Sequence, residues 1–177
     1  GWASSAPHSG GAEEIHAAID DAAGDGSIRA VLLTGAGRAF SSGAELSGTD
    51  ARATDDGKPD VLTGLRETYN PLILAVRELP KPVVAAVNGP AAGVGCSLAL
   101  ASDIVIASDS AYFLMAFANI GLTVDGGASA FLTARVGHAR AAEMALLAEK
   151  LPAEKALEWG LINRVVAGEG HLGRPGL

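Results

Sequence analysis

Three parts of the sequence carry residue types that could hold a negative charge or move a proton: two glycine-bearing segments and one aspartate. The segments are RAFSSGAEL (38–46) and NGPAAGVGCSLALASD (88–103). The glycines of the second segment predict a tight turn directly before a helix. Backbone N–H groups in such a turn are unpaired and have the positive end of the helix dipole behind them, so they can hold an oxyanion or a phosphate. The alternative is that these glycines only permit close packing of the helix on a strand.

The aspartate is Asp125, which precedes the pair Gly126-Gly127. Apolar residues before it predict a setting that raises the pKa of its carboxyl group, as proton transfer near neutral pH requires; they are Phe117, Ile120, Leu122 and Val124. The alternative is that Asp125 caps the helix expected to begin at Gly126, a common use of aspartate. Both interpretations remain open, and the two roles are compatible.

Helices alternate with buried strands along the chain, which predicts one α/β layered domain. The organising stretch is Lys81–Ser108, expected to form strand, glycine turn, helix and strand. The other strands are expected within 28–34, 111–115 and 161–166, and the other helices within 11–23, 61–78, 126–136, 140–149 and 152–159. Residues 1–11 are expected to be a disordered lead-in, 12–166 the core, and 167–177 a flexible tail.

Composition excludes several classes of function. The net charge of −7 and the lack of a basic stripe argue against nucleic acid as a partner. Gly, Pro and Asp interrupt the apolar runs well short of a membrane span, and no secretory signal is evident, so we expect a cytoplasmic protein that does not act at a membrane. The single cysteine, Cys96, excludes an internal disulfide, and the four histidines lack metal-ligand spacing, so no metal site is expected.

Taken together, four motifs resemble the crotonase (enoyl-CoA hydratase/isomerase) superfamily. They are the two segments above, about fifty residues apart, followed in the family's order by FLMAFANIGLTVDGGASAFLTARVGHARAAEMAL (113–146) and LPAEKALEWGLINRVV (151–166). A lone glycine-rich loop would be a weak signal, but four motifs in register are specific. The resemblance implies a crotonase-like spiral of ββα units that binds an acyl-CoA thioester.

The resemblance also implies roles for individual residues. The thioester oxygen would lie between the backbone N–H groups of Ala44 and Val94, which stabilise an enolate at roughly 2–4 kcal/mol per donor. Coenzyme A would be part of the substrate, with no separate cofactor, and the family forms homo-oligomers, trimers or hexamers. The residues expected to contact substrate or coenzyme A are Ser42, Glu45, Leu46, Ala91, Gly93, Ser97, Phe117 and Leu122.

The reaction depends on the acids near the enolate. Hydratases of this family use two glutamates, and this chain has Ser97 and Phe117 at the matching positions, neither of which is a base at neutral pH. Asp125 resembles the single acid of the enoyl-CoA isomerases, which favours a 1,3-proton shift. It also resembles the nucleophilic aspartate of 4-chlorobenzoyl-CoA dehalogenase relatives, but their histidine would fall near Asn70, which cannot take a proton from water.

Three hypotheses therefore stand: an isomerase that uses Asp125, a hydratase or other crotonase enzyme with a different base, and an inactive acyl-CoA-binding fragment. The third arises because both ends depart from the family. Residues 1–11 lack the family's first strand and its coenzyme A loop, and the chain lacks the helices that follow the last strand. The fold is thus expected to be truncated at both ends.

Overall fold

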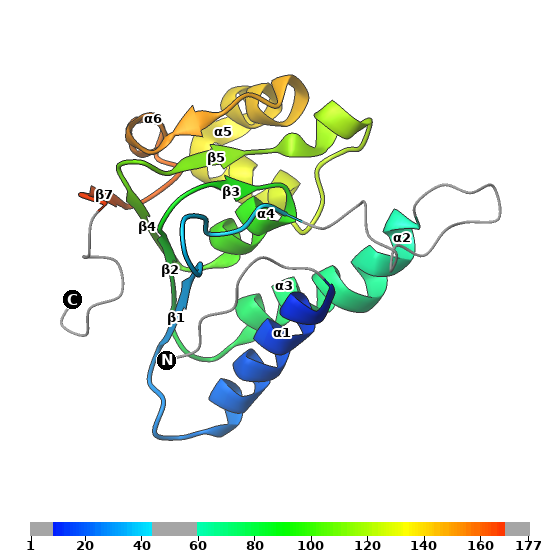
Figure 1. Ribbon diagram of the computed structural model, residues 1–177, viewed down its shortest axis with the longest axis vertical. Helices are drawn as coiled ribbons and strands as arrows, with labels where there is room; N and C mark the ends of the chain where they lie inside the picture. The colour runs from blue at the N-terminus through cyan, green and yellow to red at the C-terminus, as the bar shows by residue number, and fades with distance from the viewer. Residues whose placement is uncertain (1–8, 44–59, 169–177) are drawn as a thin grey trace.

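Two β-sheets form the centre of the protein in the computed structural model, which describes residues 9–43 and 60–168 (Figure 1). The larger sheet has the strand order β1-β2-β4-β7 and is parallel throughout. The smaller has the order β3-β5-β6, with β3 and β5 parallel and β6 antiparallel to β5. The strands are β1 (Val31–Thr34), β2 (Val83–Val87), β3 (Ala91–Ala92), β4 (Ile104–Ser108), β5 (Tyr112–Leu114), β6 (Leu151–Pro152) and β7 (Arg164–Val166).

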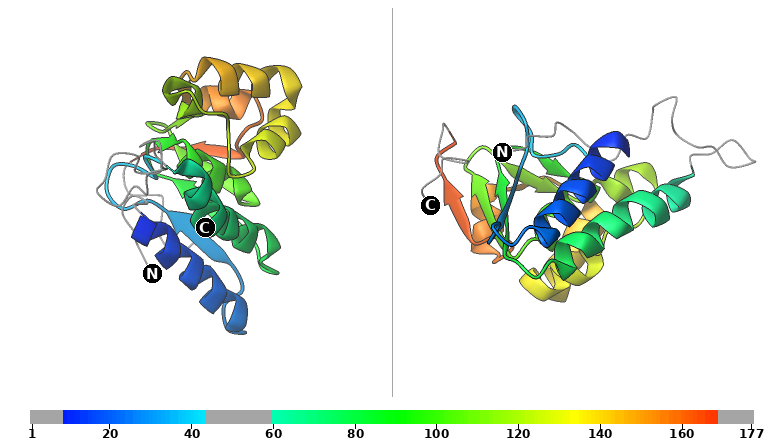
Figure 2. Two further views of the ribbon diagram at one scale, coloured as in Figure 1. Left: turned by 90° about the vertical axis from the view of Figure 1, so that its right-hand side faces the viewer. Right: turned by 90° about the horizontal axis from the view of Figure 1, so that it is seen from below.

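Helices lie at both ends of the molecule, with the sheets between them (Figures 1 and 2). At one end are α1 (Ser9–Gly24) and α3 (Asn70–Glu78), and at the other are α5 (Ala128–Leu147) and α6 (Ala153–Glu158). Helix α3 continues from the short α2 (Val61–Gly64) and a π-helical turn, η1 (Leu65–Tyr69). A 3₁₀ turn, η2 (Ala116–Ile120), lies between β5 and α5.

Helix α4 (Val94–Ala101) lies at the centre of the fold, within the stretch 81–108 that the sequence indicated as the organising one. All eight of its residues are buried. Leu98 and Ala101 pack in a cluster with α1 and α3, whereas Cys96, Ala99 and Leu100 pack in a second cluster with the strands and α5. Such two-sided burial explains why this helix is built from small apolar residues and carries no polar face.

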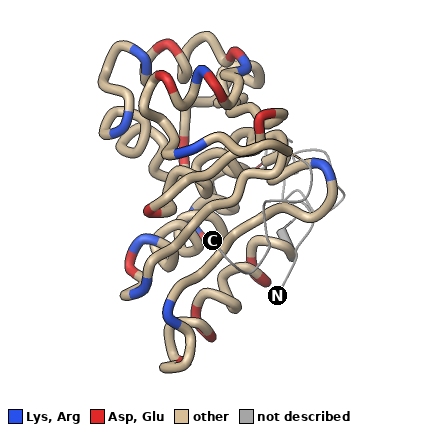
Figure 3. Tube along the Cα trace, turned by 90° about the vertical axis from the view of Figure 1, so that its left-hand side faces the viewer, with Lys and Arg blue, Asp and Glu red and all other residues tan. Residues whose placement is uncertain are grey.

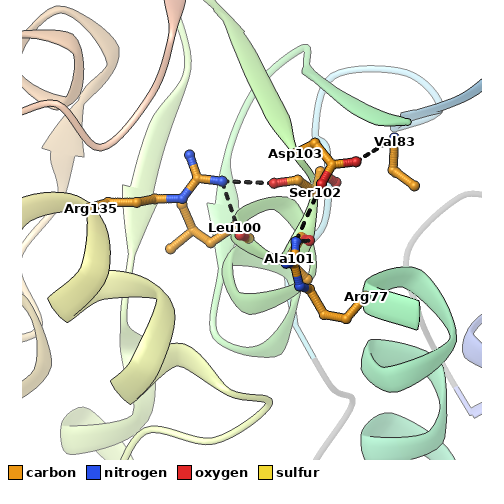
Figure 4. Close-up of polar contacts among 7 residues, drawn as sticks. All are labelled: Arg77, Val83, Leu100, Ala101, Ser102, Asp103 and Arg135. Atoms are coloured by element: carbon orange, nitrogen blue, oxygen red, sulfur yellow. Dashed lines mark hydrogen bonds and ion pairs between the residues drawn. The ribbon is translucent and has the colours of Figure 1, made fainter. Parts of the chain in front are cut away.

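Polar contacts fix the C-terminal end of α4 (Figure 4). The Arg135 guanidinium, from α5, donates to the carbonyl oxygens of Leu100 at 3.2 Å and Ser102 at 2.7 Å, which the helix end leaves unpaired. Asp103 Oδ2 accepts the Val83 N–H at 2.8 Å, and its Oδ1 lies 3.5 Å from an Arg77 nitrogen. Asp103 therefore ties the start of β4 to the start of β2.

Several element boundaries differ from the expected ones. The first strand begins only at Val31, and the long helix begins at Ala128 rather than at Gly126 because Gly126 and Gly127 both have positive φ. The expected break between 136 and 140 is a kink at Gly137, where φ is +75°. The two-residue strands β3 and β6 were not predicted, since segments this short carry no periodicity.

Basic and acidic residues are interspersed along the described part of the chain, as the tube in Figure 3 shows. Within residues 9–43 and 60–168, none of the helices has the length and apolar character needed to cross a membrane.

Candidate active site

The two glycine-bearing segments meet at one edge of the parallel sheet. They follow β1 and β2, which are neighbours in the sheet and parallel, so the loops after them leave from the same edge. Beyond the strands the chains stay together: Ser41 and Ala91 form a parallel bridge, and the Ala92 N–H donates to the Ser41 carbonyl at 2.9 Å. The fold thus brings the two loops together, as expected from the sequence.

Asn88 holds the beginning of the two loops together. Its Oδ1 accepts the Gly35 N–H at 3.0 Å, and its Nδ2 donates to the Gly37 carbonyl at 2.9 Å. Close packing also explains one glycine of the second loop, because a Cβ atom on Gly95 would collide with the Ser41 side chain. The packing interpretation of the glycines therefore holds at Gly95.

Gly93 serves a different purpose, because its backbone turns the chain into α4. Its φ and ψ are +53° and −131°, a conformation that residues with a side chain essentially do not adopt. The following residue, Val94, is the first of α4, and no acceptor in the described part of the chain pairs with its N–H. The N–H expected to hold an oxyanion is therefore present at the N-terminus of a buried helix.

The second expected donor, Ala44, lies outside the described residues, as do Glu45 and Leu46. The described residue before it, Gly43, has a φ of +93° and lies beside Gly93: a Cβ atom on Gly43 would be 3.7 Å from the Gly93 Cα. The structure thus brings together the residues that directly precede the two expected donors. Ser42, between Ser41 and Gly43, is exposed.

Asp125 lies in the turn between η2 and α5, and its side chain is half-buried. Burial raises the pKa of its carboxyl group to about 6. Its Oδ1 atom is buried and has no hydrogen-bond partner within residues 9–43 and 60–168. The N-cap of α5 is Gly127, which has no side-chain capping bond. The capping interpretation of Asp125 is therefore wrong, because the two positive-φ glycines delay the start of the helix.

The Asp125 turn packs directly on the first turn of α4. The Ser97 hydroxyl, fully buried, donates to the Asp125 carbonyl oxygen at 3.0 Å. A Cβ atom on Gly126 would lie 3.0 Å from Ser97 Cβ and 3.4 Å from a methyl carbon of Val94. These contacts place the acid beside the helix turn that bears the Val94 N–H.

Of the other residues predicted for the site, Phe117 and Ala91 are buried in the fold, whereas Ile120 is exposed. Phe117 is buried with its ring tip beside Gly93, where a Cβ atom would be 4.0 Å from it, and the Leu122 N–H donates to the Phe117 carbonyl at 3.0 Å. Ala91 is buried in β3. Ile120, in contrast, is the last residue of the 3₁₀ turn and is 52% exposed, so it does not shield Asp125 as expected.

Tyr69 was not anticipated from the sequence. It ends the π-helical turn η1 and lines an apolar hollow whose other walls are Leu72, Ile73, Val94, Gly95 and Leu98. Burial, and then the charge of Asp125, raise the pKa of its phenol. The sequence feature that could have pointed to Tyr69 is Pro71. Proline has no backbone N–H, so inside the predicted helix it favours an irregular turn. Such π-helical turns occur frequently at functional sites.

The parallel sheet, the two meeting glycine loops and the unpaired N–H at the start of a buried helix define a crotonase-type protein. The chain belongs to the enoyl-CoA hydratase/isomerase family, whose sequence model matches residues 8–173. Among solved structures, an enoyl-CoA hydratase from Mycobacterium avium subsp. paratuberculosis matches with a TM-score of 0.81 at 46% identity, covering 93% of this chain. The expected crotonase fold is thereby confirmed.

Curated relatives carry both isomerase and hydratase names. The chain is 48% identical over 145 residues to the 1,2-epoxyphenylacetyl-CoA isomerase of Escherichia coli K12, and 50% identical over 156 residues to a Rhodobacter capsulatus protein named "Probable enoyl-CoA hydratase". The alignments cover 82% and 86% of this chain but only 55% and 57% of those relatives. Of the solved structure above, 63% is covered. The chain thus spans less than two thirds of the length of these three proteins.

Proposed function

We propose that the protein is an enoyl-CoA isomerase in which Asp125 moves a proton along the acyl chain of a coenzyme A thioester. One observation carries this proposal: the carboxyl group of Asp125 is half-buried, its Oδ1 atom has no hydrogen-bond partner among the described residues, and its turn packs on the first turn of α4, which bears the Val94 N–H. A base for proton transfer near neutral pH needs this combination of raised pKa and free acceptor atom.

The proposed reaction is a 1,3-shift that conjugates a 3-enoyl thioester. The Asp125 carboxylate takes a proton from C2, and the electron pair of that C–H bond forms a dienolate whose negative charge rests on the thioester oxygen. The Val94 N–H, together with the N–H expected at Ala44, stabilises that oxygen. The neutral Asp125 acid then returns the proton at C4, which leaves the double bond between C2 and C3 and restores the carboxylate.

Two features favour isomerisation over hydration. Hydration by the family's two-carboxylate mechanism needs a second acid across a water molecule, whereas Ser97 and Phe117 stand at the positions that the resemblance assigns to those acids. Ser97 is fully buried and its hydroxyl is engaged with the Asp125 carbonyl oxygen, and Phe117 is buried and apolar. The isomerase name of the Escherichia coli relative agrees with this choice, whereas the hydratase name of the Rhodobacter capsulatus relative does not.

The test is turnover of a 3-enoyl-CoA by the purified chain, followed as formation of the conjugated 2-enoyl-CoA. Asp125→Asn should reduce the rate about 10³-fold while leaving thioester binding intact, because the amide keeps the size of the side chain but cannot take a proton. The exposed Asp21→Asn variant is the matched control. Hydration of a 2-enoyl-CoA that survives in Asp125→Asn would support a hydratase with another base, and thioester binding without turnover would support a binding fragment.

A further inference from the structure

Ser97 makes contacts that suggest a role beyond packing. It lies one helical turn after Val94 in α4 and has no exposed surface. Its Oγ atom is 3.0 Å from the Asp125 carbonyl oxygen and 3.5 Å from the Gly93 carbonyl oxygen. A hydroxyl has one hydrogen to donate, so the shorter contact is the principal bond.

The backbone of Asp125 is held more firmly than its side chain. Its carbonyl oxygen accepts two hydrogen bonds, from the Ser97 hydroxyl and from the Ala128 N–H at 3.0 Å. The next residue, Gly126, lies directly on Ser97 Cβ. Meanwhile the Asp125 Oδ1 atom has no hydrogen-bond partner in the described part of the chain. The aspartate is therefore positioned through its main chain rather than through its carboxylate.

Ser97 also belongs to the turn that presents the Val94 N–H. The N–H groups of Cys96 and Ser97 donate to the Gly93 carbonyl at 3.0 and 3.2 Å, so Ser97 shares the hydrogen-bonded turn that follows Gly93. One buried residue thus contacts both the backbone that bears the oxyanion donor and the backbone that bears the acid.

We propose that Ser97 is a positioning residue that fixes the Asp125 turn against the first turn of α4, so that the carboxylate is held at a constant distance from the Val94 N–H. The expected effect of Ser97 on turnover rests on the proposed isomerase function. The position of the Asp125 turn against α4 can be tested without turnover. A displacement of about 1 Å between such groups reduces a rate by as much as about 10²-fold.

The chain offers a closely matched control for the loss of the Ser97 hydroxyl. Ser102 follows α4 and is also fully buried, and none of the described residues forms a hydrogen bond with its hydroxyl. Ser97→Ala and Ser102→Ala therefore remove the same atom from equally buried sites, and only the first breaks a contact with Asp125. Ser97→Cys, which keeps the size and a weaker donor, serves as a graded variant in case Ser97→Ala folds poorly.

The first measurement is the pKa of Asp125, read by NMR titration of the chain labelled with ¹³C at the aspartate carboxyl carbons, with the signal assigned from Asp125→Asn. Because the released turn admits water to the carboxylate, Ser97→Ala should lower this pKa by about half a unit or more, and Ser97→Cys by less. Ser102→Ala should leave it unchanged. Equal pKa values in the wild type and Ser97→Ala would overturn the proposal, since a residue that only packs would not alter the hydration of the carboxylate.

The second measurement is the division between kcat and KM for the 3-enoyl-CoA. Ser97→Ala should lower kcat about tenfold and change KM less than about twofold, whereas Ser102→Ala should change neither. A loss confined to KM would contradict a positioning role. If the wild type shows no turnover, the isomerase proposal fails, and the NMR titration still decides the role of Ser97.

Discussion

The backbone of Gly43 lies against the backbone of Gly93, with the Gly93 Cα 3.7 Å from the position of a Cβ atom on Gly43. Each glycine directly precedes one of the two expected oxyanion donors, Ala44 and Val94. Two loops about fifty residues apart in the sequence are thus brought together at the two residues whose conformation directs those N–H groups.

Gly93→Ala should reduce both stability and kcat. The φ of +53° with ψ of −131° costs a residue with a Cβ atom about 1–3 kcal/mol, and relief of that strain would rotate the Val94 N–H away from the thioester oxygen. Loss of one such donor lowers kcat by about 10²-fold or more. Gly137→Ala is the control: Gly137 has a φ of +75° in an exposed kink of α5 with no atoms within 4 Å of its Cβ position, so kcat should survive there. Wild-type kcat in Gly93→Ala would show that Val94 is not a donor.

The rate of isomerisation should rise with pH through about 6 and level off above it. Burial raises the pKa of Asp125 to about 6, and the proposed base acts as the carboxylate. The measurement is kcat/KM as a function of pH, with buffers of constant ionic strength. A rate that falls as the pH rises through this range would mean that the protonated acid is the form that starts the reaction.

The same group should make the wild type less stable above pH 6 than its Asp125→Asn variant. The folded state binds the Asp125 proton more tightly than the unfolded state does, so the stability of the wild type falls as the pH rises from about 4 to about 6. Asn carries no charge to bury and should gain about 1 kcal/mol above pH 6, a figure reduced for solvent screening at this half-buried site. Urea denaturation at pH 4 and pH 7 checks this, and the gain should vanish at pH 4. A gain of equal size at both pH values would contradict it.

The parts of the site that local interactions form could be predicted from the sequence, whereas the parts that depend on contacts between distant residues could not. The turn at Gly93 and the helix after it are local, and the glycines and small apolar residues of 88–103 predict them directly. The start of α5 was placed two residues early because the effect of the two glycines on Asp125 depends on their packing against Ser97 and Val94. The Ser97 bond to Asp125 joins residues 28 positions apart, and no local pattern predicts it.

Asp125→Asn should also change the titration of Tyr69. Burial is the main cause of the raised pKa of this phenol and the charge of Asp125 is the second, so removal of the charge should lower the pKa while leaving it above the ordinary value. The chain has two tyrosines, so phenolate absorbance in a Tyr112→Phe background reports Tyr69 alone. Asp21→Asn should leave that titration unchanged. An identical curve in Asp125→Asn would show that the two side chains do not share one site.

Arg135→Met should destabilise the protein by about 3 kcal/mol, because it removes the donor that serves three carbonyl groups around the end of α4. The guanidinium donates to Leu100 at 3.2 Å, Ser102 at 2.7 Å and Leu161 at 3.2 Å (Figure 4 draws the first two), and the methionine leaves these carbonyls without that partner. Arg140→Met is the matched control: Arg140 is exposed and donates to one carbonyl, that of Trp159, so its loss should cost less than about 1 kcal/mol.

Urea denaturation of both arginine variants, with kcat measured on the folded fraction, separates stability from catalysis. Arg135 holds the C-terminal end of α4, whereas the expected oxyanion donor and Ser97 lie in its first turn, so the folded Arg135→Met protein should keep kcat within about threefold of the wild type. A large loss of kcat without a loss of stability would mean that the two ends of this buried helix do not act independently. The anchoring of α4 by Arg135 would then be part of the placement of the Val94 N–H.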